Sequence, residues 1–294
     1  MSQSRTADLL YDAKATVGEG ALWNARTQEL YWVDILEKKF CIYNPATRQN
    51  RAFDCGQYVG TCVVRKSGGV MLAVHHGFAH LDLTSGKLTT VATVEGLPDK
   101  IRFNDGKCDP AGRFWAGTME MRGEAGLGVM YRLDPDRRLH KMFDGIAISN
   151  GIVWSLDRRR MYFIDTLKFT IDVFDYDDAI GNVTNRRVAV SSPKELGWPD
   201  GMAIDAEGML WVAYYLGNKV VRWNPNNGQL LNQIRVPTKN VTSCAFGGPK
   251  LDKLYITSAR AGLEPAELAN DPHAGALFVA DPGVAGAATF EFAG

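Results

Sequence analysis

A pattern of about 40 to 50 residues recurs six times along the chain and limits the folds open to it. Its clearest copy begins at Asp200 and Gly201, which are followed by a short strand pattern, a tight turn at Ala206-Glu207-Gly208 and a second strand pattern with alternating apolar positions. The copies begin at residues 20, 60, 106, 151, 201 and 243, at intervals of 40, 46, 45, 50 and 42 residues. A unit of that length, built from strands and turns, is typical of a β-propeller. We therefore predict an all-β chain that forms a six-bladed β-propeller of four-stranded antiparallel blades.

The two ends of the chain are expected to close the ring. Residues 7–17 carry a strand pattern before the first copy, and residues 276–281 and 288–294 carry strand patterns after the last one. Strands from both ends that join the last blade would remove the exposed edges of an open set of repeats. With 294 residues and 46% hydrophobic content, the chain can bury a large core, so we predict a single domain over residues 1–294. Residues 265–269 are expected to form a helical insert, and the glycine-rich loop 121–128 is a candidate lid.

Charge and hydropathy exclude several classes of partner. Lys plus Arg and Asp plus Glu both number 33, and a net charge of zero argues against nucleic acid, which requires a basic face. No run of 18 apolar residues is present, so no membrane helix is expected, and residues 1–14 lack the apolar centre of a secretory signal. Five scattered cysteines without a C-x-x-C motif favour reduced thiols. These features predict a cytoplasmic protein, either a monomer or a weak homo-oligomer.

The polar residues that open the copies are the candidate functional residues. Glu19, Asp105, Asn150 and Asp200 each stand immediately before the glycine that starts a copy. Equivalent positions of different blades meet around the axis of a propeller, so these side chains are expected to converge. Carboxylate and amide oxygens suit one divalent cation, namely Ca²⁺, Mg²⁺, Mn²⁺ or carboxylate-bound Zn²⁺. The alternative is that each side chain only accepts hydrogen bonds from its own turn, but recurrence in register favours the shared site.

Long stretches of the chain resemble the gluconolactonase–regucalcin (senescence marker protein) family of six-bladed propellers. The matching segments include GEGALW, RFNDGKCDPAGRFWAGTM, ISNGIVWSLD and PDGMAIDAEGMLWVA. The resemblance implies one divalent cation held by Glu19, Asn150 and Asp200. It also implies hydrolysis of sugar lactones, with Arg102 and Asn104 in contact with the substrate.

One position departs from the family pattern and leaves substrate preference open. The family member that the chain most resembles has a glutamate on the lid, just after the GTM motif, that contacts the sugar hydroxyls. Arg122 stands at the corresponding position here, and Glu120 lies two residues earlier. We therefore include Glu120 and Arg122 among the expected substrate-binding residues.

Three functions are compatible with the sequence to different degrees. The first is a metal-dependent lactonase acting on an aldonolactone such as D-glucono-1,5-lactone, in which the cation polarises the carbonyl and Asp200 is the general base for water. The second is a calcium-binding regulatory protein without turnover. The third, a protein-interaction propeller, is disfavoured because polar residues rather than aromatics open the blades. No H-E-x-x-H, G-x-S-x-G or G-K-[ST] motif is present, which argues against the corresponding zinc, serine-hydrolase and phosphate sites.

Overall fold

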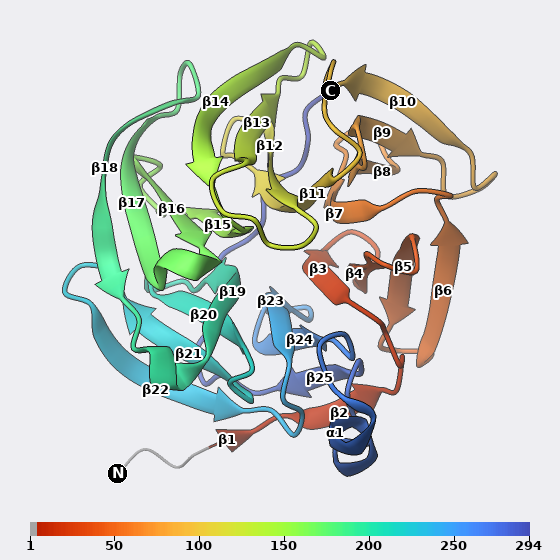
Figure 1. Ribbon diagram of the computed structural model, residues 1–294, viewed down its shortest axis with the longest axis vertical. Helices are drawn as coiled ribbons and strands as arrows, with labels where there is room; N and C mark the ends of the chain where they lie inside the picture. The colour runs from red at the N-terminus through yellow and green to blue at the C-terminus, as the bar shows by residue number, and fades with distance from the viewer. Residues whose placement is uncertain (1–4) are drawn as a thin grey trace.

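Six antiparallel β-sheets surround a central axis in the computed structural model, which describes residues 5–294 (Figure 1). Residues 1–4 of the expected domain lie outside the described residues. The first strand of each blade lies nearest the axis, and successive strands follow outward. The prediction of a six-bladed propeller with four-stranded blades is confirmed. The ring places the six innermost strands side by side around one channel.

The blades follow the chain order. Blade one contains β3 (Gly18–Asn24), β4 (Glu29–Asp34), β5 (Lys39–Asn44) and β6 (Gln49–Asp54). Blade two contains β7 (Val59–Val64), β8 (Val70–Val74), β9 (Gly77–Leu81) and β10 (Leu88–Thr93). Blade three contains β11 (Ile101–Cys108), β12 (Phe114–Glu120), β13 (Gly128–Leu133) and β14 (Leu139–Ile146). Blade four contains β15 (Ser149–Trp154), β16 (Arg160–Asp165), β17 (Thr170–Asp177) and β18 (Asn182–Ser191).

The last two blades include strands from the N-terminus. Blade five contains β19 (Trp198–Ile204), β20 (Leu210–Tyr215), β21 (Lys219–Asn224) and β22 (Gln229–Arg235), with the short β1 (Arg5–Thr6) parallel to β22. Blade six contains β23 (Val241–Gly247), β24 (Lys253–Ser258), β25 (Leu277–Ala280) and, as its outer strand, β2 (Asp8–Tyr11). Short helices are η1 (Thr166–Lys168), η2 (Lys194–Leu196) and α1 (Pro265–Asn270), the last confirming the helical insert. Because β2 pairs with β25, strands from both ends of the sequence close the ring, as expected.

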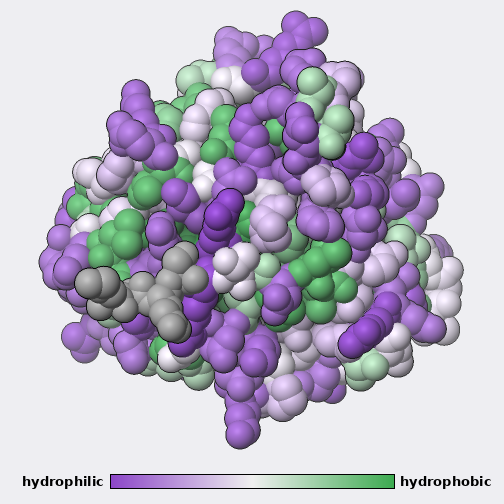
Figure 2. Space-filling view, turned by 90° about the horizontal axis from the view of Figure 1, so that it is seen from below, coloured by the Kyte–Doolittle hydropathy of each residue, from purple (hydrophilic) through white to green (hydrophobic). Residues whose placement is uncertain are grey.

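The core lies between neighbouring sheets. All residues of β3 and β4 are buried, whereas most of β6 is exposed, so each blade is apolar inside and polar at its rim. Trp115 packs with Trp154 and Phe163 of blade four, and Trp211 packs with Phe246 of blade six. Figure 2 shows the side of the ring, where apolar side chains form separate small groups among hydrophilic ones. Buried polar side chains near the axis therefore need hydrogen-bond or ion partners.

The prediction that residues 288–294 form a strand of the last blade is wrong. Residues 285–293 instead cross one end of the channel, where Ala287 N donates to Ile204 O of blade five and Phe292 N donates to Val64 O of blade two. The outer edge of β25 is already occupied by β2. Burial of Phe292 among blade-two and blade-three side chains favours the observed path. The C-terminus accordingly lies near blades two and three, across the ring from the N-terminus (Figure 1).

No helix within residues 5–294 is long and apolar enough to cross a membrane.

Candidate metal and substrate site

All six innermost strands change register at one position. The pairing shifts next to Glu19, Gly60, Asp105, Asn150, Asp200 and Thr242, each of which lies at the start of a copy or one residue before it. A bulge of this kind bends a strand and redirects a side chain, and it is common beside functional sites. The repeated bulge is what turns polar side chains of different blades toward the axis.

Glycines beside the bulges allow the inner strands to approach closely. A Cβ on Gly201 would lie 2.4 Å from Ser243 Oγ, and one on Gly151 would lie 2.5 Å from Met202 Cβ. Real Cβ atoms do not make such contacts, so no larger residue fits without a shift of the neighbouring strand. The glycine after each polar residue thus keeps Glu19, Asn150 and Asp200 close around one point.

These three residues line a cavity of about 580 Å³ at the end of the channel opposite the C-terminal segment. Arg102 and Asn104 line it as well, so the structure brings together five expected residues of the inner strands, and the expected residue Arg122 joins them from a loop. All five are buried. A volume of this size is typical of a small-molecule site.

The two carboxyl groups of the cavity strongly influence each other. Burial raises the pKa of Glu19 to about 7, and the nearby Asp105 charge contributes to the increase. Burial and the adjacent Glu19 carboxylate raise the pKa of Asp200 well above its usual range. Within residues 5–294, Asp200 Oδ1 is buried without a hydrogen-bond partner. Two like charges and an unpartnered oxygen at a buried site are what a bound cation would stabilise.

The donor set fits a hard divalent cation. Two carboxylates and the amide oxygen of Asn150 supply oxygen ligands only, which suits Ca²⁺, Mg²⁺ or Mn²⁺ and is compatible with carboxylate-bound Zn²⁺. Within residues 5–294 no three His, Cys, Asp or Glu side chains are grouped so that they could hold a metal. An ion at this site would therefore depend on Asn150 as its third protein ligand.

A chain of hydrogen bonds fixes the amide of Asn150. Arg102 Nη1 donates to Asn104 Oδ1 at 2.6 Å, and Asn104 Nδ2 donates to Asn150 Oδ1 at 3.0 Å. Asn150 Nδ2 donates to Thr166 Oγ1 at 2.7 Å, and that hydroxyl donates to Pro199 O at 2.8 Å. The chain runs from blade three to blade five, so the positions of the cavity residues are mutually dependent.

Arg102 is the buried cation of the cavity floor. Burial lowers its pKa to about 10, while the carboxyl groups of Glu19 and Asp200 act in the opposite direction. The guanidinium therefore stays charged at neutral pH, and it faces the two acids across the cavity.

Asp105, the fourth acid expected from the repeat, does not line this cavity. Its Oδ1 accepts the N–H of Gly106 at 2.7 Å, and its Oδ2 is buried without a hydrogen-bond partner. Burial raises its pKa, and the charge of Lys107 opposes that rise. Lys107 itself donates to Met202 O farther down the channel. Asp105 thus lies between the cavity and the closed part of the channel.

Of the two substrate-binding residues expected near the loop between β12 and β13, Glu120 and Arg122, the structure brings only Arg122 to the cavity. Arg122 lines the cavity together with Met121 and Gly123. Glu120 does not line it, because its carboxylate accepts the backbone N–H of Arg122 at 2.7 Å and of Glu124 at 3.0 Å. Glu120 therefore shapes the loop, and Arg122 is the charged side chain that the loop brings to the cavity.

Sequence reasoning missed the aromatic wall of the cavity. Trp198 and Tyr215 line it, with ring centroids 6.3 Å apart, and Trp198 keeps 38% of its surface exposed. Tyr215 Oη donates to Ala261 O at 2.6 Å, which fixes the ring. The sequence places Trp198 directly before Pro199-Asp200-Gly201, which could have indicated an aromatic residue beside the site. Whether that side chain is exposed at the cavity depends on the tertiary structure.

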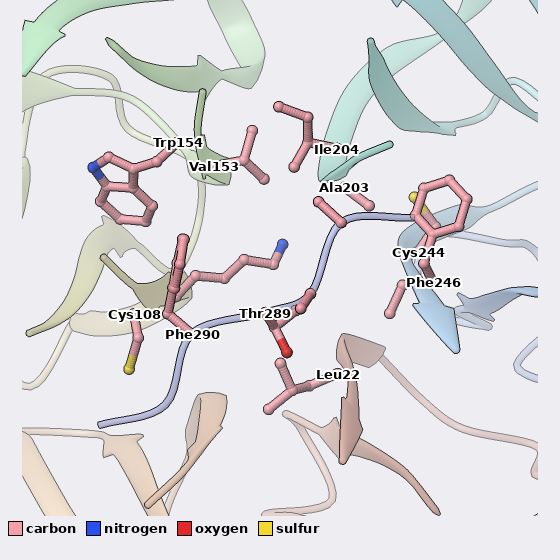
Figure 3. A pocket seen from close by; sticks show the side chains of 14 residues that line it. Leu22, Cys108, Val153, Trp154, Ala203, Ile204, Cys244, Phe246, Thr289 and Phe290 are labelled. Atoms are coloured by element: carbon pink, nitrogen blue, oxygen red, sulfur yellow. The ribbon is translucent and has the colours of Figure 1, made fainter. Parts of the chain in front are cut away.

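The opposite end of the channel is closed. Inner-strand residues Leu22, Val153 and Cys244 surround a cavity of about 40 Å³, and Thr289 and Phe290 of the C-terminal segment lie across it (Figure 3). That volume holds little more than one water molecule. Within residues 5–294 the C-terminal segment covers this end, and the larger cavity that the polar residues line lies at the other end.

The fold and this cavity define a class of protein: a six-bladed propeller with an oxygen-rich site at one mouth of its channel. Residues 17–260 match the family described as SMP-30/Gluconolactonase/LRE-like region, and the chain belongs to that family. Regucalcin of Oryctolagus cuniculus is 42% identical over 94% of this chain and 95% of its own length.

Two solved structures are similar over nearly the whole chain. A luciferin-regenerating enzyme is 32% identical, with a TM-score of 0.90 and coverage of 96% of both chains. Regucalcin from Agrobacterium tumefaciens, described as a calcium-binding protein, is 27% identical, with a TM-score of 0.92 and coverage of 100% of this chain and 99% of its own.

Proposed function

We propose that the protein is a divalent-cation-dependent lactonase that hydrolyses a sugar lactone, such as D-glucono-1,5-lactone, to the aldonic acid. The observation that carries the proposal is the buried pair of Glu19 and Asp200, with an unpartnered Asp200 oxygen, at the floor of a cavity large enough for a sugar. Membership of a family whose description includes gluconolactonase supports the same reaction class.

Glu19, Asn150 and Asp200 are the residues that would hold the cation. When bound, a divalent cation polarises a carbonyl oxygen and stabilises the negative charge that develops on it. Water attack on the lactone carbonyl carbon forms a new C–O bond and breaks the ring C–O bond. The ring oxygen leaves as a hydroxyl group after it takes up a proton.

Asp200 is the proposed general base. Its Oδ1 has no other hydrogen-bond partner, so it is free to accept a proton from the attacking water and to return it to the leaving ring oxygen. Proton transfer of this kind typically contributes about 10²–10⁴-fold to a rate.

The remaining cavity residues would position the sugar. Of the three guanidinium nitrogens of Arg102, only Nη1 donates hydrogen bonds to other described residues. The N–H groups of the other two nitrogens are available to substrate oxygens. Asn104 is held by Arg102 and contributes a polar floor. Trp198 and Tyr215 offer an apolar wall for the carbon face of a sugar ring.

The second candidate function is a calcium-binding protein without turnover. It is favoured by the regucalcin names of the relatives and by the description of the Agrobacterium tumefaciens protein as calcium-binding. The same donor set serves both functions, so only turnover distinguishes them.

The test is a pH-indicator hydrolysis screen of five- and six-carbon aldonolactones. Protein freed of metal with a chelator is assayed alone and with Ca²⁺, Zn²⁺, Mn²⁺ or Mg²⁺, beside Asp200→Asn and the exposed control Asp136→Asn. The lactonase proposal expects cation-dependent turnover that Asp200→Asn abolishes and Asp136→Asn retains. Calcium binding without hydrolysis supports the second function, and neither binding nor hydrolysis overturns both.

We further propose that the protein works in the cytoplasm as one domain, monomeric or weakly self-associating, without nucleic-acid or membrane partners. The zero net charge and the free, buried cysteines support this. Light scattering at micromolar concentration tests the oligomeric state.

A further inference from the structure

We propose that the lactone taken by this site carries a carboxylate at the end remote from its reacting carbonyl, as the lactone of an aldaric acid does, and that Arg122 binds that carboxylate. The inference rests on the proposed lactonase function and narrows its substrate class.

Arg122 lies at the cavity with its charge uncompensated by an ion pair. Within residues 5–294 its guanidinium has no acidic partner within 4 Å, although the side chain lines the cavity. The acids of its own loop are engaged elsewhere. Glu124 pairs with Lys100 at 3.3 Å, and Glu120 accepts two backbone N–H groups, although its carboxylate still feels the Arg122 charge. Arg122 is thus the cation of this loop that is available to a ligand.

The charged residues that line the cavity also favour a substrate with a negative charge. The charged residues that line it are Glu19, Asp200, Arg102 and Arg122. A divalent cation would balance the two carboxylates and leave two guanidinium groups. Arg102 is buried on the floor and faces both acids, whereas Arg122 is exposed on the lid loop. The positive charge that remains unbalanced is therefore the guanidinium of Arg122, on the loop between β12 and β13. A neutral sugar would not pair with this charge.

The chemistry of the side chain selects a carboxylate. A guanidinium group offers a planar fork of N–H donors that matches two carboxylate oxygens, and it keeps its charge at all relevant pH values. A hydroxymethyl group at the same place offers a single, uncharged oxygen and cannot form this two-oxygen, charge-assisted pairing. The cavity of about 580 Å³ accommodates a six-carbon acid.

The test compares matched lactones that differ only at C6. Hydrolysis of D-glucaro- and D-glucono-lactones, in both the 1,4 and 1,5 forms, is measured for the cation-loaded wild-type protein, Arg122→Gln and the matched control Arg159→Gln. We expect kcat/KM for a glucarolactone to exceed that for its gluconolactone at least tenfold. Arg122→Gln should lower the glucarolactone value at least tenfold and change the gluconolactone value less than threefold. Arg159→Gln removes an exposed arginine charge that does not line the cavity and should change both values less than threefold.

The outcomes separate this inference from the proposed function. Efficient hydrolysis of gluconolactone without preference for glucarolactone would overturn the inference and leave the lactonase intact. An equal loss on both substrates in Arg122→Gln would assign Arg122 to loop structure and would also overturn it. No hydrolysis of any lactone would refute the proposed function, and the inference with it.

Discussion

The side-chain amide of Asn150 is fixed by Thr166, whose Oγ1 accepts the amide N–H at 2.7 Å and donates to Pro199 O at 2.8 Å. Thr166 is buried on η1, outside the strand pattern that identified the other site residues. It connects the inner strand of blade four to that of blade five, and it leaves the Asn150 oxygen directed to the cavity side.

Thr166→Val should therefore weaken cation binding without removing a proposed ligand. Loss of an outer partner of a metal ligand typically costs about 10–100-fold in affinity. Thr166→Ser keeps the hydroxyl and should bind within threefold of wild type. Calorimetric titration with Ca²⁺ and Mn²⁺ measures the effect, and equal affinities for all three proteins would show that Thr166 does not support the site.

The proposed ligand set predicts how a cation changes thermal stability. A ligand that binds only the native state at 100 times its Kd adds about 2.7 kcal/mol to the free energy of unfolding. We expect the Tm of chelator-treated wild-type protein to rise when the cation is added, and Glu19→Gln to lose that rise. Asp105→Asn should keep most of it, because Asp105 does not line the cavity. Loss of the rise in Asp105→Asn alone would place the ion deeper in the channel than we propose.

The repeat pointed to four polar residues, Glu19, Asp105, Asn150 and Asp200, and the family resemblance selected the three proposed metal ligands among them. Glu19, Asn150 and Asp200 occupy one position of the repeated unit, and the symmetry of a propeller converts equal positions into spatial neighbours. Arg102 and Asn104 were expected at the site from the family resemblance of the RFND segment, and both lie on β11, the inner strand of blade three. Regular elements thus carried their side chains to predictable places.

The irregular segments were less accessible for a physical reason. Glu120 and Arg122 stand two residues apart, yet the turn uses the Glu120 carboxylate to hold its own N–H groups and leaves Arg122 at the cavity. The path of residues 285–293 depended on competition between two tertiary partners, the edge of β25 and the end of the channel. The local sequence does not predict either the loop conformation or the path of the C-terminal segment, because both depend on hydrogen-bond and packing partners from elsewhere in the fold.

Gly201→Ala tests the close approach of inner strands that gathers the site. The added methyl group would lie 2.4 Å from Ser243 Oγ and 2.8 Å from Ser243 Cα, so strand β19 or β23 must move. Overpacking of this kind costs about 1–3 kcal/mol. Chemical denaturation should show this loss, and Ser243→Gly in the same protein should restore part of it by removing the Oγ and Cβ contacts. A Gly201→Ala protein as stable as wild type would contradict the close packing of these strands.

Phe292→Ala should lower stability and spare the site. Phe292 is 1% exposed and packs with Phe103 and Phe114, while its backbone bonds to blade two. Removal of a buried phenylalanine side chain costs about 3–5 kcal/mol, which in a chain of this size lowers Tm by about 5–8 °C. Cation affinity at 25 °C should be unchanged, because the C-terminal segment closes the end of the channel remote from Glu19 and Asp200.

The partly exposed Phe290 provides the matched control, and Phe290→Ala should lower the free energy of unfolding by less than half as much as Phe292→Ala. Equal losses in the two variants would mean that the segment is held by its backbone hydrogen bonds rather than by the burial of Phe292.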